Sequence, residues 1–404
     1  MRVGREVAIV STGLVPWDLY PDKSMAELGA EVVVQALKKA NMHWREIETI
    51  AAGGYHWIAD KEGMSGLLAA TSIESLLGGT GIPVVNVANA CATSQSILRE
   101  AYFAIASGVH DVALVVAADK SSGGFFKPQS NDAQFDLDYK RYVMTGETNP
   151  SYWAMEARRR MHDMGTTEDD LALVKVVTSK GAPGNPYARY RKVFTKEEIL
   201  NSPMVCDPLH LYEISATSDG AAALILTTLD KAKKYTKKPV LIEGVTVATS
   251  SYGEQTIPLF NLSTFPRPGV PALTESRTCV NNLYKMTNRK PEDIDIIELP
   301  DNSSWHYLAY LDCILRLEMG EAEKMLRRGD TDPIDGKIPT CTGGGAGASG
   351  EAIVAQGLYF ICEAIDQLRG EAGERQVKKD VKVTLTQTYG YAGNNSACIL
   401  SRAW

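Results

Sequence analysis

Cys91 has the residue type and the position that nucleophilic chemistry needs. It lies between an apolar stretch, Val84 to Val87, and a predicted helix from about Ala92 to Ser107. The unpaired N–H groups and the positive dipole end of a helix stabilise a thiolate over a thiol. We therefore predict an exposed Cys91 thiol with a lowered pKa. The alternative is a small buried thiol, which is the usual role of a free cysteine.

A glycine-rich turn from Gly343 to Gly350 is the second feature that could serve chemistry. Glycine is needed where the backbone approaches a ligand closely, and consecutive backbone N–H groups bind anions. We expect the backbone at Gly345 and Gly347 to donate to an enolate or thioester oxyanion. Cys341, just before the turn, is assigned to packing rather than to chemistry.

The composition is that of an ordinary soluble globular protein. The 404 residues are 44% apolar and 23% charged, with a net charge of −7. This balance argues against nucleic-acid binding, and the first apolar run is too short for a membrane span or an export signal. The cysteines form no C-x-x-C pair, so we expect neither a disulfide scaffold nor a metal site. These features predict a cytoplasmic protein.

The order of predicted elements repeats in two halves. In the first half a helix at 26–40 precedes a strand, and the segment 84–117 holds a strand, the Cys91 turn, a helix and another strand. In the second half a helix at 280–286 precedes a strand, and 338–385 holds a strand, the glycine turn, a helix at 351–368 and a strand. This alternation predicts a duplicated α/β fold with parallel strands flanked by helices.

A middle segment of different composition separates the two halves. Its basic clusters, Arg158 to Arg160 and Arg189 to Lys192, suit phosphate groups, although solvated helix faces explain most charge runs. We expect this long excursion to cover a phosphate-bearing ligand. The predicted domains are an N-terminal domain at 1–119 and 212–238, a loop domain at 120–211, and a C-terminal domain at 239–404.

These features together resemble the thiolase superfamily over nearly the full chain. The resemblance rests on the strand, Asn89-Ala90-Cys91-Ala92-Thr93-Ser94 and helix element, on the segment Ser215 to Ala223, and on the duplicated halves. It is strongest to the sterol-carrier-protein-type and archaeal-type thiolases, whose coenzyme A loop resembles Asn185-Pro186-Tyr187-Ala188.

The resemblance implies a fold and a set of ligand contacts. The fold is the thiolase fold: two duplicated βαβαβαββ domains forming a five-layered αβαβα sandwich, with the loop domain inserted in the first half. Cys91 would accept the acyl group, and coenzyme A would be a substrate. Contacts to coenzyme A would come from Arg189, Arg191, Lys192 and Ser349.

The chain departs from the thiolase pattern at the acid and base positions. The turn from Gly343 to Gly350 lacks the histidine of the family's G-H-P-x-G-A-S-G signature, and the segments that carry the second cysteine are also replaced. Three side chains could take over. His306 is a replacement base or a core histidine, Asn302 is an oxyanion donor or a helix cap, and Tyr389 is a proton donor or a packing residue.

The activity implied by the resemblance is that of a thiolase acyltransferase. It would cleave a 3-oxoacyl-CoA with coenzyme A through an acyl-cysteine, or run the reverse Claisen condensation. The altered turn is similar to divergent thiolase subunits that act with a small zinc-ribbon/OB-fold partner, such as those of benzoylsuccinyl-CoA thiolases. Benzoylsuccinyl-CoA, split into benzoyl-CoA and succinyl-CoA, is then the expected substrate. A homodimeric core is also expected.

Two alternatives remain open at this point. One is a thiolase-fold retro-aldolase that splits a hydroxyacyl-CoA without a covalent intermediate, with a tyrosine moving the proton. The other is a non-catalytic subunit that binds acyl-CoA for a partner.

Overall fold

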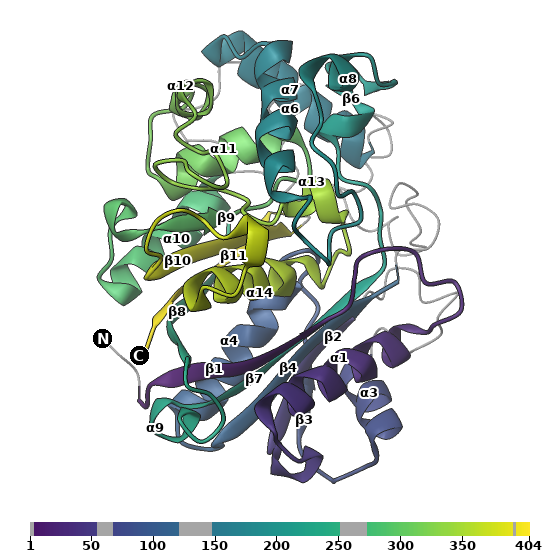
Figure 1. Cartoon of the computed structure of the whole chain (residues 1–404), viewed down its shortest axis with the longest axis vertical. Helices are drawn as coiled ribbons and strands as arrows, with labels where there is room; N and C mark the ends of the chain where they lie inside the picture. Colours follow the sequence, from purple (N-terminus) through teal and green to yellow (C-terminus); the bar gives the residue numbers. More distant parts are fainter. Residues whose placement is uncertain (1–3, 55–67, 121–147, 251–272, 391–392) are drawn as a thin grey trace.

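One mixed sheet runs through the molecule and carries both halves of the chain (Figure 1). The computed structural model describes residues 4–54, 68–120, 148–250, 273–390 and 393–404. In spatial order the strands are β3 (Val84–Asn86), β2 (Thr49–Gly54), β4 (Val112–Asp119), β7 (Gly220–Thr228), β1 (Val7–Leu14), β8 (Val240–Thr249), β11 (Asn394–Arg402), β10 (Val383–Gly390) and β9 (Ile296–Glu298).

The strand pairing confirms the predicted duplication. In the first half β2 is parallel to β4, and β4, β7 and β1 follow with antiparallel pairing. In the second half β9 is parallel to β10, and β10, β11 and β8 follow with antiparallel pairing. The halves meet where β1 pairs with β8 at two positions, Ala8 with Leu241 and Ile9 with Val240. The strand predicted at 338–341 is present only as a bridge from Thr340 to Ile297.

Helices cover both faces of each half-sheet and form the five-layered sandwich expected of a thiolase fold (Figure 1). The outer layer of the first half contains α1 (Met25–Ala40) and α3 (Ala69–Leu77). The central layer contains α4 (Thr93–Ala106) and α14 (Gln356–Arg369), which contact each other. The outer layer of the second half contains α10 (Thr274–Thr287) and α11 (Ser304–Ile314).

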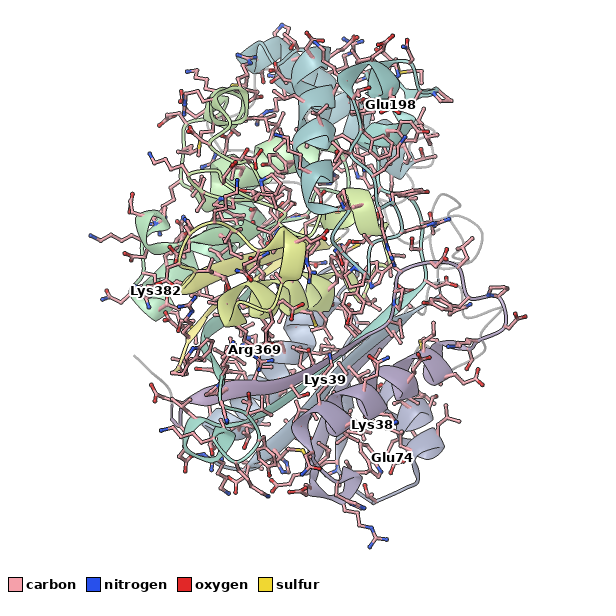
Figure 2. The ribbon with its side chains drawn as sticks, viewed as in Figure 1. Lys38, Lys39, Glu74, Glu198, Arg369 and Lys382 are labelled. Carbon is pink, nitrogen blue, oxygen red and sulfur yellow. The ribbon has the colours of Figure 1, made fainter. Side chains whose placement is uncertain are left out.

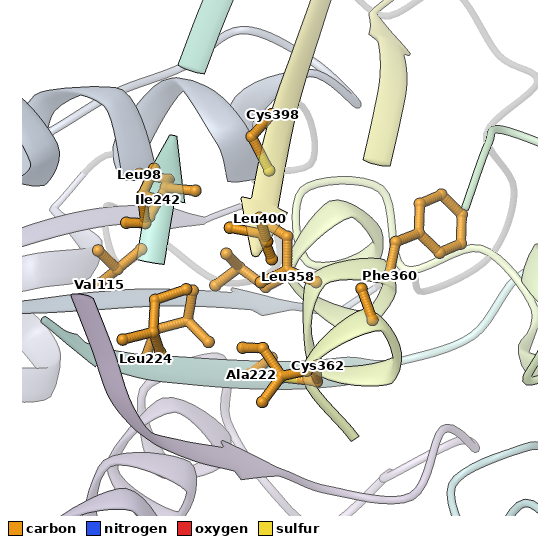
Figure 3. Packing of buried hydrophobic residues seen from close by; sticks show 14 of the residues in the cluster. Leu98, Val115, Ala222, Leu224, Ile242, Leu358, Phe360, Cys362, Cys398 and Leu400 are labelled. Carbon is orange, nitrogen blue, oxygen red and sulfur yellow. The ribbon is translucent and has the colours of Figure 1, made fainter. Parts of the chain in front are cut away.

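Alternation along the strands explains why two sets of helices are needed. In β4, Ala113 and Val115 belong to the central core, whereas Leu114 and Val116 belong to the core under α1 and α3. Successive side chains of a strand point to opposite faces, so a strand that is apolar throughout must be covered on both. Figure 3 shows the central core, where Leu358 of α14 packs among residues of both half-sheets.

The remaining elements belong mostly to the segment between the halves and to connections in the second half. They are α6 (Asn149–Met164), α7 (Glu168–Thr178), α8 (Lys196–Leu200), β5 (Met204–Cys206), β6 (Leu209–His210), α9 (Leu229–Ala232), α12 (Glu321–Arg328) and α13 (Gly345–Ser349). The predicted glycine turn therefore contains a short helix, and the helix predicted at 351–368 begins later, at Gln356.

A buried ion network ties the middle segment to the second half. Arg160 of α6 is paired with Asp312 of α11 and with Glu323 of α12, each at 2.7 Å. Burial of this cation is tolerated because both carboxylates hydrogen-bond to it. The middle segment is thus anchored on the outer helices of the second half. The predicted domain boundaries themselves remain a prediction.

Other charged side chains lie on the outer surface or at helix ends. Glu198 and Lys382 project into solvent, and Lys38 and Lys39 lie in the last turn of α1, where cations favour the negative end of the helix dipole (Figure 2). In the part of the chain that the structure describes, no helix combines the length and the apolar character of a membrane span.

Candidate active site

Cys91 lies on the sharp turn between β3 and α4, as predicted from the sequence. Ala90, the residue before it, has a φ of 48°, which is the left-handed region that costs an alanine about 1–2 kcal/mol. The turn is held by hydrogen bonds from the Ala92 N–H to the Asn89 carbonyl at 3.0 Å and from the Asn89 N–H to the Thr93 hydroxyl at 2.8 Å. The left-handed backbone conformation of Ala90 turns the chain so that Cys91 lies just before α4.

The predicted ionisation state of Cys91 is wrong. Its side chain is buried, with 1% of the residue exposed, and packs against Ile353 and Val354. Burial raises the pKa of the thiol well above its usual value, and the negative charges of Glu351 and Asp119 raise it further. Loss of hydration and the nearby carboxylates therefore outweigh the helix dipole. At neutral pH the site holds a protonated thiol.

Glu351 is the functional candidate that the sequence analysis missed. Its Oε1 accepts a hydrogen bond from the Cys91 thiol at 3.6 Å, and its Oε2 accepts one from the Ser215 hydroxyl at 3.2 Å. Burial raises the pKa of the Glu351 carboxyl, which makes it a stronger base than an exposed glutamate. The signal in the sequence was an acidic residue between the glycine turn and an apolar run, which was assigned only to a helix start.

The backbone around Glu351 explains how a residue so far along the chain reaches Cys91. The Glu351 N–H donates to the Ala216 carbonyl at 2.7 Å, and its carbonyl accepts from the Ser218 N–H at 3.0 Å. Gly350, with a φ of 87°, approaches Ser218 so closely that an added Cβ would lie 2.1 Å from its Oγ. A larger residue at Gly350 would push Glu351 away from the thiol.

A second contact holds the segment after Glu351 against the first half. Asp119, at the end of β4, accepts a hydrogen bond from the Val354 N–H at 2.9 Å, and the Ser94 hydroxyl donates to the Val354 carbonyl. The pKa of the Asp119 carboxyl is raised well above its usual value, mainly by burial. Segment 351–354 is thus hydrogen-bonded to the first half through both β4 and α4.

Asn302 lies beside Glu351, as expected of a residue in the site. It is fully buried, its Nδ2 donates to Gln356 at 3.0 Å, and its side chain hydrogen-bonds to the Glu351 carboxylate and lowers the pKa of that group. The amide therefore contacts the Glu351 carboxylate directly. Whether it donates to a substrate oxyanion remains a prediction.

His306 and Tyr389 are in aromatic contact, with their ring planes tilted by 32°, and Tyr389 lies near Cys91 and Glu351. The two ring centroids are 4.6 Å apart. The Nδ1 of His306 is 2.8 Å from the Ser303 hydroxyl, and its Nε2 has no partner among the described residues. Burial lowers the pKa of His306 well below its usual value, so the ring is neutral. Within the described chain no hydrogen bond links it to Cys91, and its predicted role as base stays a prediction.

Tyr389 lies near Cys91 and Glu351. Burial raises the pKa of its phenol well above the usual value, and the neighbouring ionisable groups of Cys91 and Glu351 raise it further. A phenol in this position stays protonated and can donate a hydrogen bond. Its predicted role as proton donor is compatible with this environment.

The glycine turn is already occupied by a carboxylate from the same chain. Asp301 accepts hydrogen bonds from the Ala346 N–H at 2.6 Å and from the Gly347 N–H at 3.1 Å. An added Cβ at Gly345 would lie 2.3 Å from the Asp301 carboxylate, so this glycine permits the close approach. An oxyanion could use the Gly347 N–H only by displacing Asp301. The oxyanion role expected of Gly345 and Gly347 stays a prediction.

A pocket of about 580 Å³ lies next to Ser215 and the glycine turn. Its wall includes Ser215 and Gly347, together with the aromatic side chains of Tyr190, Phe194 and Tyr212. Ser215 in the pocket wall hydrogen-bonds to Glu351, which in turn accepts a hydrogen bond from Cys91.

The side chains predicted to bind coenzyme A form hydrogen bonds or ion pairs with other residues of this chain. Arg189 donates to the Thr217 carbonyl at 2.6 Å, Arg191 donates to the Ala188 carbonyl at 3.0 Å, and Lys192 pairs with Glu198 at 3.1 Å. Ser349 is fully buried and donates to the Gly345 carbonyl at 2.9 Å. None of the four lines the pocket, so their assignment to coenzyme A remains a prediction. The described residues also contain no cluster of metal-ligating side chains.

The duplicated five-layered architecture, with a cysteine on the turn from strand to central helix, defines a thiolase-type fold. The sequence relatives agree. The chain is 31% identical to an acetyl-CoA acetyltransferase of Methanothermobacter thermautotrophicus, covering 97% of this chain and 98% of that protein. It is 27% identical to the benzoylsuccinyl-CoA thiolase subunit BbsB of Thauera aromatica, covering 96% of both. It is 29% identical to bovine sterol carrier protein 2, of which it spans 67%.

Solved structures and a domain family extend the same finding. Residues 266–402 match the family described as thiolase C-terminal domain-like. An Ltp2-ChsH2(DUF35) aldolase superposes with a TM-score of 0.78 at 24% identity, covering 99% of this chain and 98% of that one. Human mitochondrial 3-ketoacyl-CoA thiolase superposes with a TM-score of 0.71 at 14% identity, covering 99% of both chains. The chain belongs to the thiolase superfamily.

Proposed function

We propose that the protein is a thiolase-type acyltransferase that exchanges an acyl group between a carbon chain and coenzyme A through Cys91. The observation that carries the proposal is the hydrogen bond from the Cys91 thiol to the Glu351 carboxylate at 3.6 Å. A nucleophile and its base within hydrogen-bond reach are the requirement for covalent catalysis. The acetyltransferase relatives support the same reaction class.

In the first half-reaction Glu351 takes the proton from the Cys91 thiol as sulfur bonds to the ketone carbon of a 3-oxoacyl-CoA. The carbonyl re-forms as the bond to the α-carbon breaks, which leaves an acyl-cysteine and an acyl-CoA enolate. The enolate carbon takes a proton back from the Glu351 carboxylic acid. Burial raises the pKa of Glu351, which makes its carboxylate a stronger base than an exposed glutamate for taking the thiol proton.

The second half-reaction transfers the acyl group to coenzyme A. The coenzyme A thiol loses its proton to Glu351 and attacks the thioester carbon of the acyl-cysteine. The carbon–sulfur bond to Cys91 breaks, and the Cys91 sulfur takes the proton from Glu351. Both thiols then use the same base. The pocket bounded by Ser215 and Gly347 is proposed to hold the coenzyme A arm.

The finer proposal concerns the acyl group and the partners. We propose benzoylsuccinyl-CoA as substrate, with benzoyl-CoA and succinyl-CoA as products, supported by the 27% identity to BbsB and by the aromatic wall of the pocket. A homodimeric core and a small zinc-ribbon/OB-fold accessory subunit complete the proposed assembly. Co-expression with a candidate accessory protein, followed by co-purification and assay, tests the partner.

Mass spectrometry of the intact protein tests the proposed reaction. Incubation with a 3-oxoacyl-CoA and no free coenzyme A should leave an acyl adduct, which peptide mapping should place on Cys91. Addition of coenzyme A should remove it. An active enzyme that forms no adduct would overturn the proposal.

A retro-aldolase is the second candidate, and two observations favour it. The family histidine is replaced by glycine. The phenol of Tyr389 is protonated and lies close enough to Cys91 and Glu351 for these groups to raise its pKa. The superposition on an aldolase structure shows a shared fold only. In a retro-aldolase, Cys91→Ala would keep carbon–carbon cleavage of a hydroxyacyl-CoA, whereas in a thiolase it would abolish cleavage of the 3-oxoacyl-CoA.

The third candidate, a non-catalytic acyl-CoA-binding subunit, is consistent with the buried, protonated Cys91. For such a subunit Cys91→Ala would leave both acyl-CoA binding and the activity of the assembled complex unchanged. Cys91→Ala therefore separates the thiolase from the other two candidates, and Tyr389→Phe, which would abolish cleavage only in the retro-aldolase, separates those two.

A further inference from the structure

Lys175 is a buried cation on the wall of the pocket and has no role in the chemistry described above. It lies on α7, only 5% of the residue is exposed, and among the described residues that line the pocket it is the charged one. Its ammonium group is 4.9 Å from the centre of the Phe194 ring, another wall residue. A buried lysine carries a large desolvation cost unless neighbouring groups compensate its charge, so the groups around Lys175 matter.

The neighbours of Lys175 satisfy only part of its hydrogen-bonding capacity. One of its three N–H donors goes to the Gly347 carbonyl. Asp301 is the nearby opposite charge, but its two carboxylate oxygens are held by the Ala346 and Gly347 N–H groups. Within the described chain no carboxylate is in ion-pair contact with Lys175. Burial lowers the pKa of Lys175 to about 8, which leaves it mostly charged at neutral pH.

A second feature of the same wall favours negative charge. Thr148, Pro150 and Ser151 line the pocket, and they form the N-terminal cap and first turn of α6. The positive dipole end of this 16-residue helix therefore faces the pocket that Lys175 borders. The whole chain carries a net charge of −7, so the positive character is local to this wall rather than a property of the protein.

We propose that Lys175 binds an anionic oxygen group of the coenzyme A thioester that enters this pocket. The proposal rests on the proposed function for the identity of the ligand. The anionic group belongs either to the acyl chain, as a free carboxylate, or to coenzyme A, as a phosphate. Ser215 borders the same pocket and its hydroxyl donates to Glu351, so the pocket that Lys175 borders adjoins a residue that contacts the hydrogen-bond partner of Cys91.

The test measures binding rather than turnover, in a Cys91→Ala background that removes the nucleophile. Dissociation constants are measured by calorimetry for three ligands, with and without Lys175→Met. Glutaryl-CoA carries an acyl carboxylate, pentanoyl-CoA is its neutral match, and pentanoyl-pantetheine lacks the nucleotide and its phosphates. Lys196→Met is the matched control, because Lys196 is an exposed lysine paired with Asp169 outside the pocket.

If the acyl carboxylate is the ligand group, Lys175→Met should weaken glutaryl-CoA binding roughly tenfold to hundredfold and leave pentanoyl-CoA unchanged. If a phosphate is the ligand group, both coenzyme A esters should weaken alike and pentanoyl-pantetheine should not. Either result supports the proposal. Unchanged binding of all three ligands, or equal weakening of all three, would overturn it, since the second result indicates a structural role.

Two further variants keep the test decisive. Lys175→Gln replaces Lys175→Met if the latter fails to fold, and circular dichroism reports the fold. Lys175→Arg keeps the charge and should retain the preference between charged and neutral ligands. Loss of acyl adduct formation on Cys91 would reject the proposed thiolase reaction without affecting these binding constants, so the two proposals fail separately.

Discussion

The Sγ of Cys91 lies 3.6 Å from the Oε1 of Glu351, although 260 residues separate them in the chain. The two residues come from corresponding places in the two halves: one follows the strand turn of the first half, and the other follows the glycine turn of the second. The thiolase fold brings these turns together where α4 and α14 pack in the central layer. A carboxylate here can act on the thiol although the family histidine is absent.

Glu351→Gln tests the base. The variant keeps the size and the hydrogen bond to Ser215 but cannot accept the thiol proton, so kcat should fall by about 10²–10⁴. Steady-state assay with a 3-oxoacyl-CoA measures the loss, and a thermal melt checks the fold.

Glu198→Gln serves as the control for that variant. Glu198 is an exposed residue of α8 whose partner, Lys192, lies outside the pocket. The control should retain the wild-type kcat. An undiminished kcat in Glu351→Gln would mean that the thiol proton goes elsewhere.

Tyr389→Phe separates the thiolase from the retro-aldolase. If Glu351 moves the proton, loss of the phenolic hydroxyl should reduce kcat by less than about tenfold, because the ring still stacks on His306. The acyl adduct on Cys91 should still form. A loss of a thousandfold or so without any adduct would instead identify Tyr389 as the proton carrier of an aldolase.

The raised pKa of Glu213 predicts that the stability of the protein depends on pH. This buried carboxyl follows β6, and burial raises its pKa from 4.5 to about 7. The folded state favours the protonated carboxyl of Glu213. The contribution of this preference to the free energy of unfolding is complete below pH 4.5 and is lost as the pH rises through about 7. The wild-type protein should therefore become less stable relative to Glu213→Gln over this window, by at most roughly 3 kcal/mol.

Urea unfolding of both proteins at several pH values measures this difference. Glutamine keeps the acceptor for the His210 N–H, which donates to Glu213 at 2.7 Å in the wild type. The two proteins should have equal stability at the acid end, where both side chains are neutral. A difference that is constant with pH would show that Glu213 does not titrate in this window.

The edge strand β3 is the proposed contact of the homodimer. Val85 is 46% exposed on the outermost described strand of the first half, and unpaired strand edges readily pair with a second chain. Val85→Lys should place a charge in that contact and shift the protein toward monomer at micromolar concentration. Size-exclusion chromatography with light scattering measures the mass.

Val109→Lys is the matched control for the dimer test, because Val109 is 72% exposed in the turn after α4. It should leave the mass unchanged. A wild-type protein that is already monomeric at micromolar concentration would contradict the proposed dimer directly.

Local sequence pattern predicted the elements that form the framework of the site. The apolar run before Cys91, the helix after it and the repeated order of elements are confirmed as β3, α4 and the two half-sheets. These features depend on the alternation of apolar residues and on neighbours within a few positions. The start of α14 was misplaced by five residues, because the backbone of Glu351 is held by Ala216 and that of Val354 by Asp119 and Ser94.

The sequence by itself determined the family, the duplicated α/β framework and the position of Cys91 between β3 and α4. Only the tertiary structure decided that Cys91 is buried and protonated, that Glu351 is its hydrogen-bond partner, and that Asp301 occupies the N–H groups of the glycine turn. The physical reason is the distance along the chain over which each property is set. Strand and helix patterns are set by residues close in the chain, whereas a pKa depends on burial and on charges that folding brings from distant segments.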